Sequence, residues 1–250
     1  MVIRNWPFLR TIRASASLIA LLLVGCTAKA PVAPVFSAST AAIPAPSGLK
    51  ACVPNGLLAT TMGKIVGQSG EFAGCFETDQ RIQIQGVPHP VGQPLEYAFA
   101  IRLAARSSGP FTSEDIETNL AKIKEEWKSY PPLWEQRKAI YEQRVATLVH
   151  ESMDPALPAV SISLGEPLLI SIERVGEDSY AVVSIRRRKL AIDGNVAFST
   201  AIDGTSLTLV GGRLLRLSLV RELQSTGDVE MLKHDVVAWI QAVSKNQGVH

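Results

Sequence analysis

The chain has 250 residues, a formal net charge of +2 and 46% hydrophobic residues. This apolar content is enough for a folded core, and the length suits one domain or two small ones. The first 25 residues hold three of the 25 basic residues and none of the 23 acidic ones, so the remainder carries 22 and 23, or about −1. A remainder without net positive charge does not attract nucleic acid, so we expect no nucleic-acid partner.

Residues 1–25 have the layout of a removable export signal. A basic flank without acidic residues is followed by an apolar run over residues 14–25. A helix that stays in the membrane is the alternative, but crossing a bilayer takes about 20 apolar residues. The uncharged stretch between Arg13 and Lys29 is shorter than that, which favours removal.

The end of this run, Leu23-Val24-Gly25-Cys26, resembles the lipobox of bacterial lipoproteins. The resemblance covers about the first 30 residues. It implies cleavage before Cys26 and acylation of its thiol, so that the membrane is a partner through the lipidated Cys26. Because Thr27 rather than an aspartate follows, it also implies sorting to the outer membrane, with the domain facing the periplasm. Several acyl chains hold a protein firmly to a bilayer, whereas one chain binds marginally.

Residues 26–48 are rich in alanine and proline and contain one charged residue. Such a composition packs poorly and favours extended geometry. We therefore expect a disordered tether over residues 26–48 and a globular domain over 49–250. An ordered strand leading into the domain is the alternative.

Cys52 and Cys75 are the only cysteines left if Cys26 carries lipid. An exported protein matures in an oxidising compartment, where an even pair of cysteines is usually bridged. The sequence therefore predicts a disulfide between them, with two buried free thiols as the alternative.

The first half of the domain is expected to hold two strands and then two helices. Alternation at period two predicts strands over 81–85 and 97–103. Thr112 and Asp115 have the spacing of a capping box, and the helix after them should end at Tyr130-Pro131-Pro132. Its expected buried face is Ile116, Leu120, Ile123 and Trp127. A second helix is expected over 133–150, with a buried side made of Trp134, Ile140, Tyr141, Val145 and Leu148.

The second half is expected to be a strand meander closed by a helix. The expected strands cover 160–164, 169–175, 180–190, 196–200, 206–210 and 214–223. The expected turns are 176–178, Asp193-Gly194, Asp203-Gly204 and Gly211-Gly212, because tight hairpins need residues that tolerate positive φ. The final helix should open at Asp228 and bury Leu232, Val236, Trp239 or Ile240, and Val243. This order predicts an α+β fold: a single domain with a mostly antiparallel sheet flanked by helices, possibly an α/β/α sandwich.

The same order of elements is similar to that of the PsbP-like superfamily. The similarity covers residues 75–246 and rests on the Asp-Gly turns, the hairpin over 211–215, and a closing helix that contains Trp239 and Asn246. It implies an α/β/α sandwich and a binding or assembly-assisting module rather than a catalyst.

No catalytic residue, cofactor site or metal site is predicted. The chain has no Gly-x-Ser-x-Gly motif and no P-loop. Its four histidines include no pair three or four residues apart, the spacing that places two metal ligands on one face of a helix.

The basic run Arg186-Arg187-Arg188-Lys189 places four positive charges in a row. On a strand, Arg186 and Arg188 share one face and Arg187 and Lys189 the other. We expect this strand end to protrude or to lie at a sheet edge, where charge discourages aggregation. The alternative is contact with an anionic partner, such as lipid head groups, lipopolysaccharide or an acidic protein surface.

Three functions remain open. The favoured one is a lipid-anchored, non-catalytic binding or assembly module of the cell envelope, acting on an unidentified envelope protein or anionic partner. The second is an envelope enzyme whose site has no linear motif. The third is a protective or inhibitory lipoprotein that neutralises a secreted toxin.

Overall fold

The computed structural model describes residues 43–54, 70–78, 96–105, 109–130, 160–192 and 195–247, together with isolated residues at 59, 63, 107, 134, 138–140, 142–143 and 147. The lipobox with Cys26, most of the expected tether and the expected strand over 81–85 lie outside these residues. None of the helices described is long and apolar enough to span a membrane.

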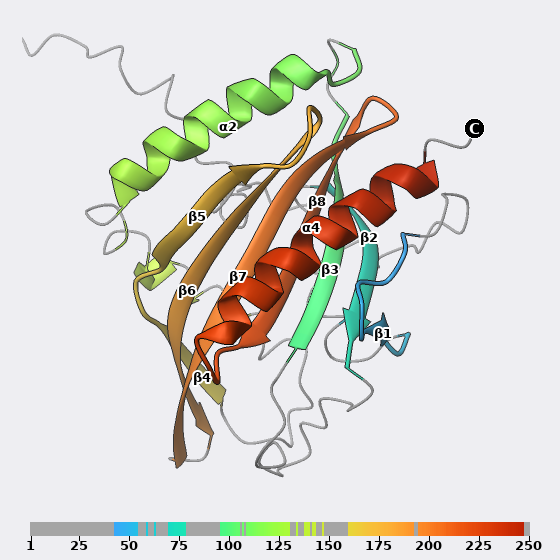
Figure 1. The fold of residues 1–250 in the computed structure, drawn as a ribbon. Helices are drawn as coiled ribbons and strands as arrows, with labels where there is room; N and C mark the ends of the chain where they lie inside the picture. Colours follow the sequence, from blue (N-terminus) through green and yellow to red (C-terminus); the bar gives the residue numbers. More distant parts are fainter. Residues whose placement is uncertain are drawn as a thin grey trace, which may run out of the picture.

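Eight strands form one antiparallel sheet in the described part of the chain, in the order β1-β2-β3-β8-β7-β6-β4, with β5 also paired to β6 (Figure 1). The strands are β1 Lys50–Ala51, β2 Gly70–Glu77, β3 Glu96–Leu103, β4 Val160–Leu164, β5 Leu168–Arg174, β6 Ser179–Ile192, β7 Asn195–Val210 and β8 Arg213–Glu222. The helices are α2 Ser113–Lys128 and α4 Gly227–Gln247. The expected α+β fold, a mostly antiparallel sheet flanked by helices, is confirmed.

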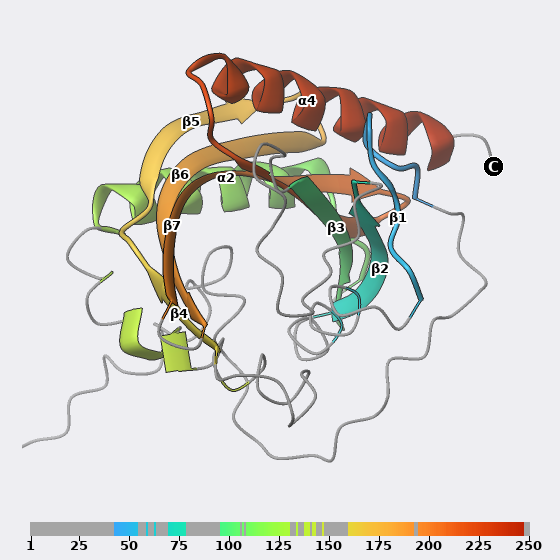
Figure 2. The same cartoon turned by 90° about the horizontal axis from the view of Figure 1, so that it is seen from below.

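The two helices cover opposite faces of the sheet. Alternate residues of β7 show this: Ile202 packs in the hydrophobic cluster that includes α4, and Leu207 packs in the cluster that includes α2. Figure 2 shows the sheet curled, with α4 across its outer side. We call the face toward α4 the outer face and the face toward α2 the inner face.

Helix α4 has the buried side that its sequence predicts. Leu232, Val236 and Val243 are buried against the outer face as expected, and so are both Trp239 and Ile240, of which one was expected. Successive positions of this set recur every three or four residues, so they form one stripe along the helix. Strand β7 meets this stripe at Gly204, where a Cβ atom would lie 2.5 Å from Cγ2 of Val236.

Helix α2 also follows its local sequence. The capping box is present, with the Thr112 amide donating to Oδ2 of Asp115 at 2.8 Å, and all four expected core residues are buried. Beyond it, the described residues between 134 and 147 are helical and Trp134 is buried, as expected. Ile140, however, is 58% exposed. It lies six residues after Trp134, about 240° around a helix, so it points away from the side that Trp134 buries.

One expected turn is wrong. Residues 195–210 form a single strand, β7, where two strands joined at Asp203-Gly204 were expected. Gly204 serves the close approach of α4 instead of a turn, and Asp203 pairs with Arg188. The turn at Gly211-Gly212 is confirmed, with φ of 56° and 72°. Residues 193–194 lie outside the described residues, although Ile192 and Asn195 on either side of them are paired.

The start of the domain is fixed in two ways. Cys52 and Cys75 form the predicted disulfide, with Cα atoms 5.3 Å apart. Residues 43–48, assigned above to the tether, pack on the domain: Ile43 is buried, and Nε1 of Trp239 donates a hydrogen bond to the Pro44 carbonyl at 2.7 Å. The packed chain therefore begins at or before Ile43, earlier than the expected boundary at residue 49.

Candidate functional site

The basic run lies in the interior of the sheet and not at an edge. Strand β6 pairs with β7 along its whole length, and β5 and β4 follow one another along its other side. At the junction of β5 and β4, the Gly165 amide donates to the Arg187 carbonyl at 2.9 Å. Of the two expected positions, the sheet edge is therefore wrong, because two short strands together flank one long strand. The strand end does protrude, because Arg187 and Lys189 pair with residues 198–200 of β7, which run beyond the end of β8.

Two of the four cations are tied to the inner face of the domain. Arg186 and Arg188 share this face, as alternation predicts. The guanidinium of Arg186 lies over the Trp134 ring, 5.4 Å from its centroid. Nη2 of Arg188 donates to Oδ1 of Asp203 at 3.0 Å, with both side chains largely buried. Each contact holds an arginine against the domain.

The inner face also holds buried polar side chains. Ser184, Arg216 and Ser218 are buried on it, as is Tyr180. Burial raises the pKa of the Tyr180 hydroxyl strongly; nearby Arg216 acts in the opposite direction, and Glu126 adds to the rise. The hydroxyl therefore stays protonated at physiological pH and does not act as a general base.

The other two cations, Arg187 and Lys189, are exposed on the outer face. The structure thus divides the basic run. Arg186 and Arg188 are engaged by the domain itself, and Arg187 and Lys189 are directed to solvent. Alternation predicts this division, but it does not predict which pair the domain engages.

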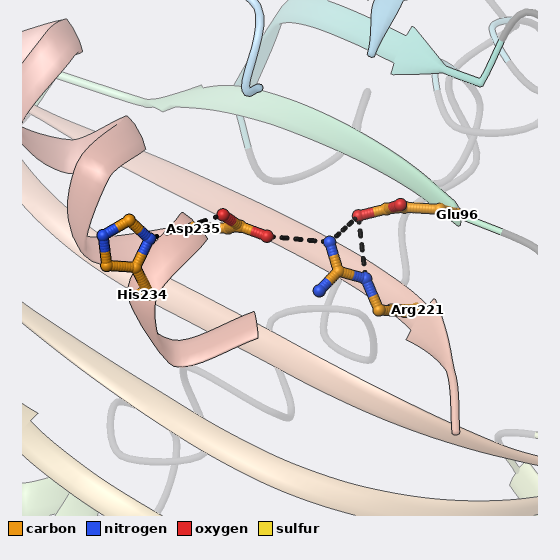
Figure 3. A network of polar contacts seen from close by, with 4 residues as sticks. All are labelled: Glu96, Arg221, His234 and Asp235. Atoms are coloured by element: carbon orange, nitrogen blue, oxygen red, sulfur yellow. Dashed lines mark hydrogen bonds and ion pairs between the residues drawn. The ribbon is translucent and has the colours of Figure 1, made fainter. Parts of the chain in front are cut away.

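A second polar group lies where β3, β8 and α4 meet. Figure 3 shows Arg221 of β8 between Glu96 of β3 and Asp235 of α4, with His234 on the far side of Asp235. Nε of Arg221 donates to Oε1 of Glu96 at 3.0 Å, and Nη2 donates to Oδ2 of Asp235 at 2.8 Å. His234 is exposed, and its Nδ1 lies 3.6 Å from Oδ1 of Asp235. Burial alone would lower the pKa of Arg221, but its hydrogen bonds with Glu96 and Asp235 raise it above the ordinary value.

These residues line a depression of about 470 Å³ at the start of α4. Its lining is Glu96, Arg221, Glu222, Gln224, Asp228, Glu230, Met231, His234 and Asp235. Asp228 accepts hydrogen bonds from the amides of Ser225 and Gln224, both at 2.7 Å, and these bonds lower the pKa of its carboxyl. Glu96 and Asp235 are bound by Arg221, and Asp228 is bound by backbone amides, so these three carboxylates hold the structure together.

Sequence reasoning missed this group because its members are far apart in the chain. Glu96 and Arg221 are separated by 125 positions, and nothing in the local pattern around either residue indicates a partner. Among the residues described, no three histidine, cysteine, aspartate or glutamate side chains are placed to hold a metal ion.

Comparison with known proteins gives no match to a protein-family model, to a curated protein or to a solved structure. The similarities to bacterial lipoproteins and to the PsbP-like superfamily therefore stay predictions from the sequence.

Proposed function

We propose that this chain is a lipid-anchored binding or assembly module of the cell envelope. Cys26 carries the lipid, the outer membrane holds it, and the domain faces the periplasm. The observation that carries the proposal is the Cys52–Cys75 disulfide. Once Cys26 is acylated, the two remaining cysteines are bonded to each other, as expected of a protein that folds outside the reducing cytoplasm.

Two features favour binding over catalysis. The fold brings together charged side chains around Arg221 and around Arg188, and within each of these two groups the charges form ion pairs. The exposed pair, Arg187 and Lys189, lies on a strand surface suited to an anionic partner. An enzyme with a scattered site and a toxin-neutralising lipoprotein gain no specific support from the described residues.

Fractionation of a Cys26→Ala variant tests the anchor. We expect the wild-type protein in the outer-membrane fraction, with an acylated peptide beginning at Cys26, and the variant outside that fraction without acyl mass. The matched control is Cys52→Ser/Cys75→Ser, which removes the other two cysteines and should remain in the membrane fraction. A Cys26→Ala variant that fractionates like the wild type would contradict the anchor.

A further inference from the structure

The end of the β6–β7 hairpin exposes two apolar side chains on its outer face. Phe198 is 77% exposed and Val196 is 49% exposed. In the strand register Phe198 lies opposite Lys189, and Val196 lies opposite Ala191. Side chains alternate along a strand, so Phe198 and Val196 share the face of Ile202, which packs toward α4.

Two exposed cations belong to the same surface. Arg187 lies opposite Thr200, one pair further along than Lys189 and Phe198, and points to the same face. No ion pair of Arg187 or Lys189 is found among the described residues. Residues 186–198 contain four cations and one acid, Asp193. The surface is therefore apolar at Phe198 and Val196, with cations beside them.

This surface lies at a projecting end of the sheet. Pairing between β7 and β8 begins only at Ala201 and Glu222, so residues 195–200 of β7 run beyond the end of β8. Figure 1 shows the β6–β7 hairpin, with β4 beside it, extending past the other strands. The hairpin end is therefore a projecting part of the sheet among the described strands.

We infer that the outer face of this hairpin end, formed by Arg187, Lys189, Val196 and Phe198, contacts an anionic lipid surface. Phe198 and Val196 enter the interfacial layer, and Arg187 and Lys189 bind lipid phosphates. Aromatic and basic residues together are typical of such contacts. A bilayer needs no matching shape, so a hairpin end with two apolar and two basic side chains is sufficient for the contact.

The inference rests on the proposed lipid anchor for its geometry. Residues 26–42 would join Cys26 to the packed chain at Ile43 and, at about 3 Å per residue in extended form, would reach some 50 Å. The hairpin end can therefore meet the same bilayer that holds the lipid. Anchoring converts a weak contact into an intramolecular one at high effective concentration.

A tryptophan at position 198 reports the contact directly. The intact lipidated protein carrying Phe198→Trp is mixed with vesicles of anionic lipid that contain brominated acyl chains, which quench nearby tryptophan emission. The native Trp127, Trp134 and Trp239 are buried, so the unsubstituted protein supplies the background. Met231→Trp is the control, because Met231 is 52% exposed and belongs to a different element, helix α4.

We expect emission from Phe198→Trp to be quenched at least twofold more than emission from Met231→Trp. Added salt or zwitterionic vesicles should weaken the quenching. Arg187→Gln/Lys189→Gln should reduce it several-fold, because both cations attract the lipid head groups. Lys122→Gln/Lys124→Gln, which removes two exposed cations from α2, should leave it unchanged.

Equal quenching at positions 198 and 231 would overturn the inference. A change in emission that depends on the protein concentration and not on the lipid concentration would also overturn the inference, because it would indicate a second copy of the chain as the partner. The mass of the Cys26 peptide reports the anchor separately. Acylation without quenching rejects only the hairpin contact, and quenching without acylation, with vesicles in excess, rejects only the anchor.

Discussion

At the scale of single residues, the ionisation of Asp228 is coupled to the fold. Its carboxylate accepts hydrogen bonds from the amides of Gln224 and Ser225 and from the Ser225 hydroxyl at 3.0 Å. These bonds close the connection between β8 and α4. Because they favour the charged form, they lower the pKa of Asp228.

Asp228→Asn should therefore destabilise the protein in a pH-dependent way. Folding lowers the pKa of Asp228, so its charge stabilises the folded protein fully when the pH is above the pKa of an aspartate in the unfolded chain, about 4. This stabilisation is lost as the pH falls through the pKa of Asp228 in the folded protein. We expect a loss of about 1–2 kcal/mol at pH 7 that shrinks toward zero below pH 4. Urea unfolding of both proteins across this range measures it. The control is Glu230→Gln, at an exposed carboxylate of the same depression. A loss independent of pH would mean that the charge of Asp228 is not the stabilising feature.

At the scale of elements, the contact between β7 and α4 depends on the missing side chain at Gly204. A Cβ there would lie 2.5 Å from Cγ2 of Val236 and 3.0 Å from Cδ2 of Leu232, two buried residues of α4. Gly204→Ala should cost about 1–3 kcal/mol, since the added methyl overpacks a filled core. Thermal unfolding measures the loss, and Val236→Ala in the same chain should restore part of it.

Gly227→Ala is the comparison for this substitution. Gly227 is the first residue of α4, and the nearest heavy atom to its Cβ position would be Oγ of Ser225 at 3.6 Å, an ordinary contact. Alanine also favours helix over glycine, so we expect no loss of stability. Equal losses at residues 204 and 227 would contradict the packing explanation.

The sequence predicts the features of the elements that depend on neighbouring residues, but not those that depend on how distant segments pack. The buried stripes of α2 and α4 and the turn at Gly211-Gly212 depend on neighbours within a few positions, and all three were predicted. The prediction of a turn at Gly204 is wrong because a glycine after an aspartate can have either of two roles: a turn residue with positive φ, or a position where another element packs closely. The local sequence does not distinguish the two. The position of β6 within the sheet depends on strand order, which no local pattern states. Of the two positions that the sequence predicts for the basic run, a projecting strand end is therefore right and a sheet edge is wrong.

The same distinction holds for the candidate site. Alternation along β6 places Arg186 and Arg188 on one face and Arg187 and Lys189 on the other, and the structure agrees. Which face is engaged depends on Trp134 and Asp203, which belong to other elements. The ion pairs of Arg221 with Glu96 and Asp235 need three segments to meet, and sequence spacing carries no sign of that.

At the scale of the whole molecule, the N-terminal segment is the link between the expected tether and the core. Residues 43–54 are held through Ile43, through the bond from Trp239 to the Pro44 carbonyl, and through the disulfide at Cys52. Cys52 follows the two-residue strand β1, and its amide donates to the Cys75 carbonyl at 2.9 Å. A strand this short offers few hydrogen bonds, so we expect the disulfide to contribute strongly to holding this segment.

Reduction of the disulfide should therefore loosen this segment before it unfolds the domain. Removing a bridge that closes a loop of this size costs roughly 3 kcal/mol, and the loss should fall on residues 43–54 because α4 and β8 make their contacts without it. Hydrogen exchange measured by mass spectrometry should show faster exchange over residues 43–54 after reduction, with α4 and β8 still protected. The Cys52→Ser/Cys75→Ser variant should exchange like the reduced protein and not respond to reductant. If residues 43–54 stay protected after reduction, Ile43 and Trp239 hold the segment without the disulfide, and the bridge is not what joins the tether to the core.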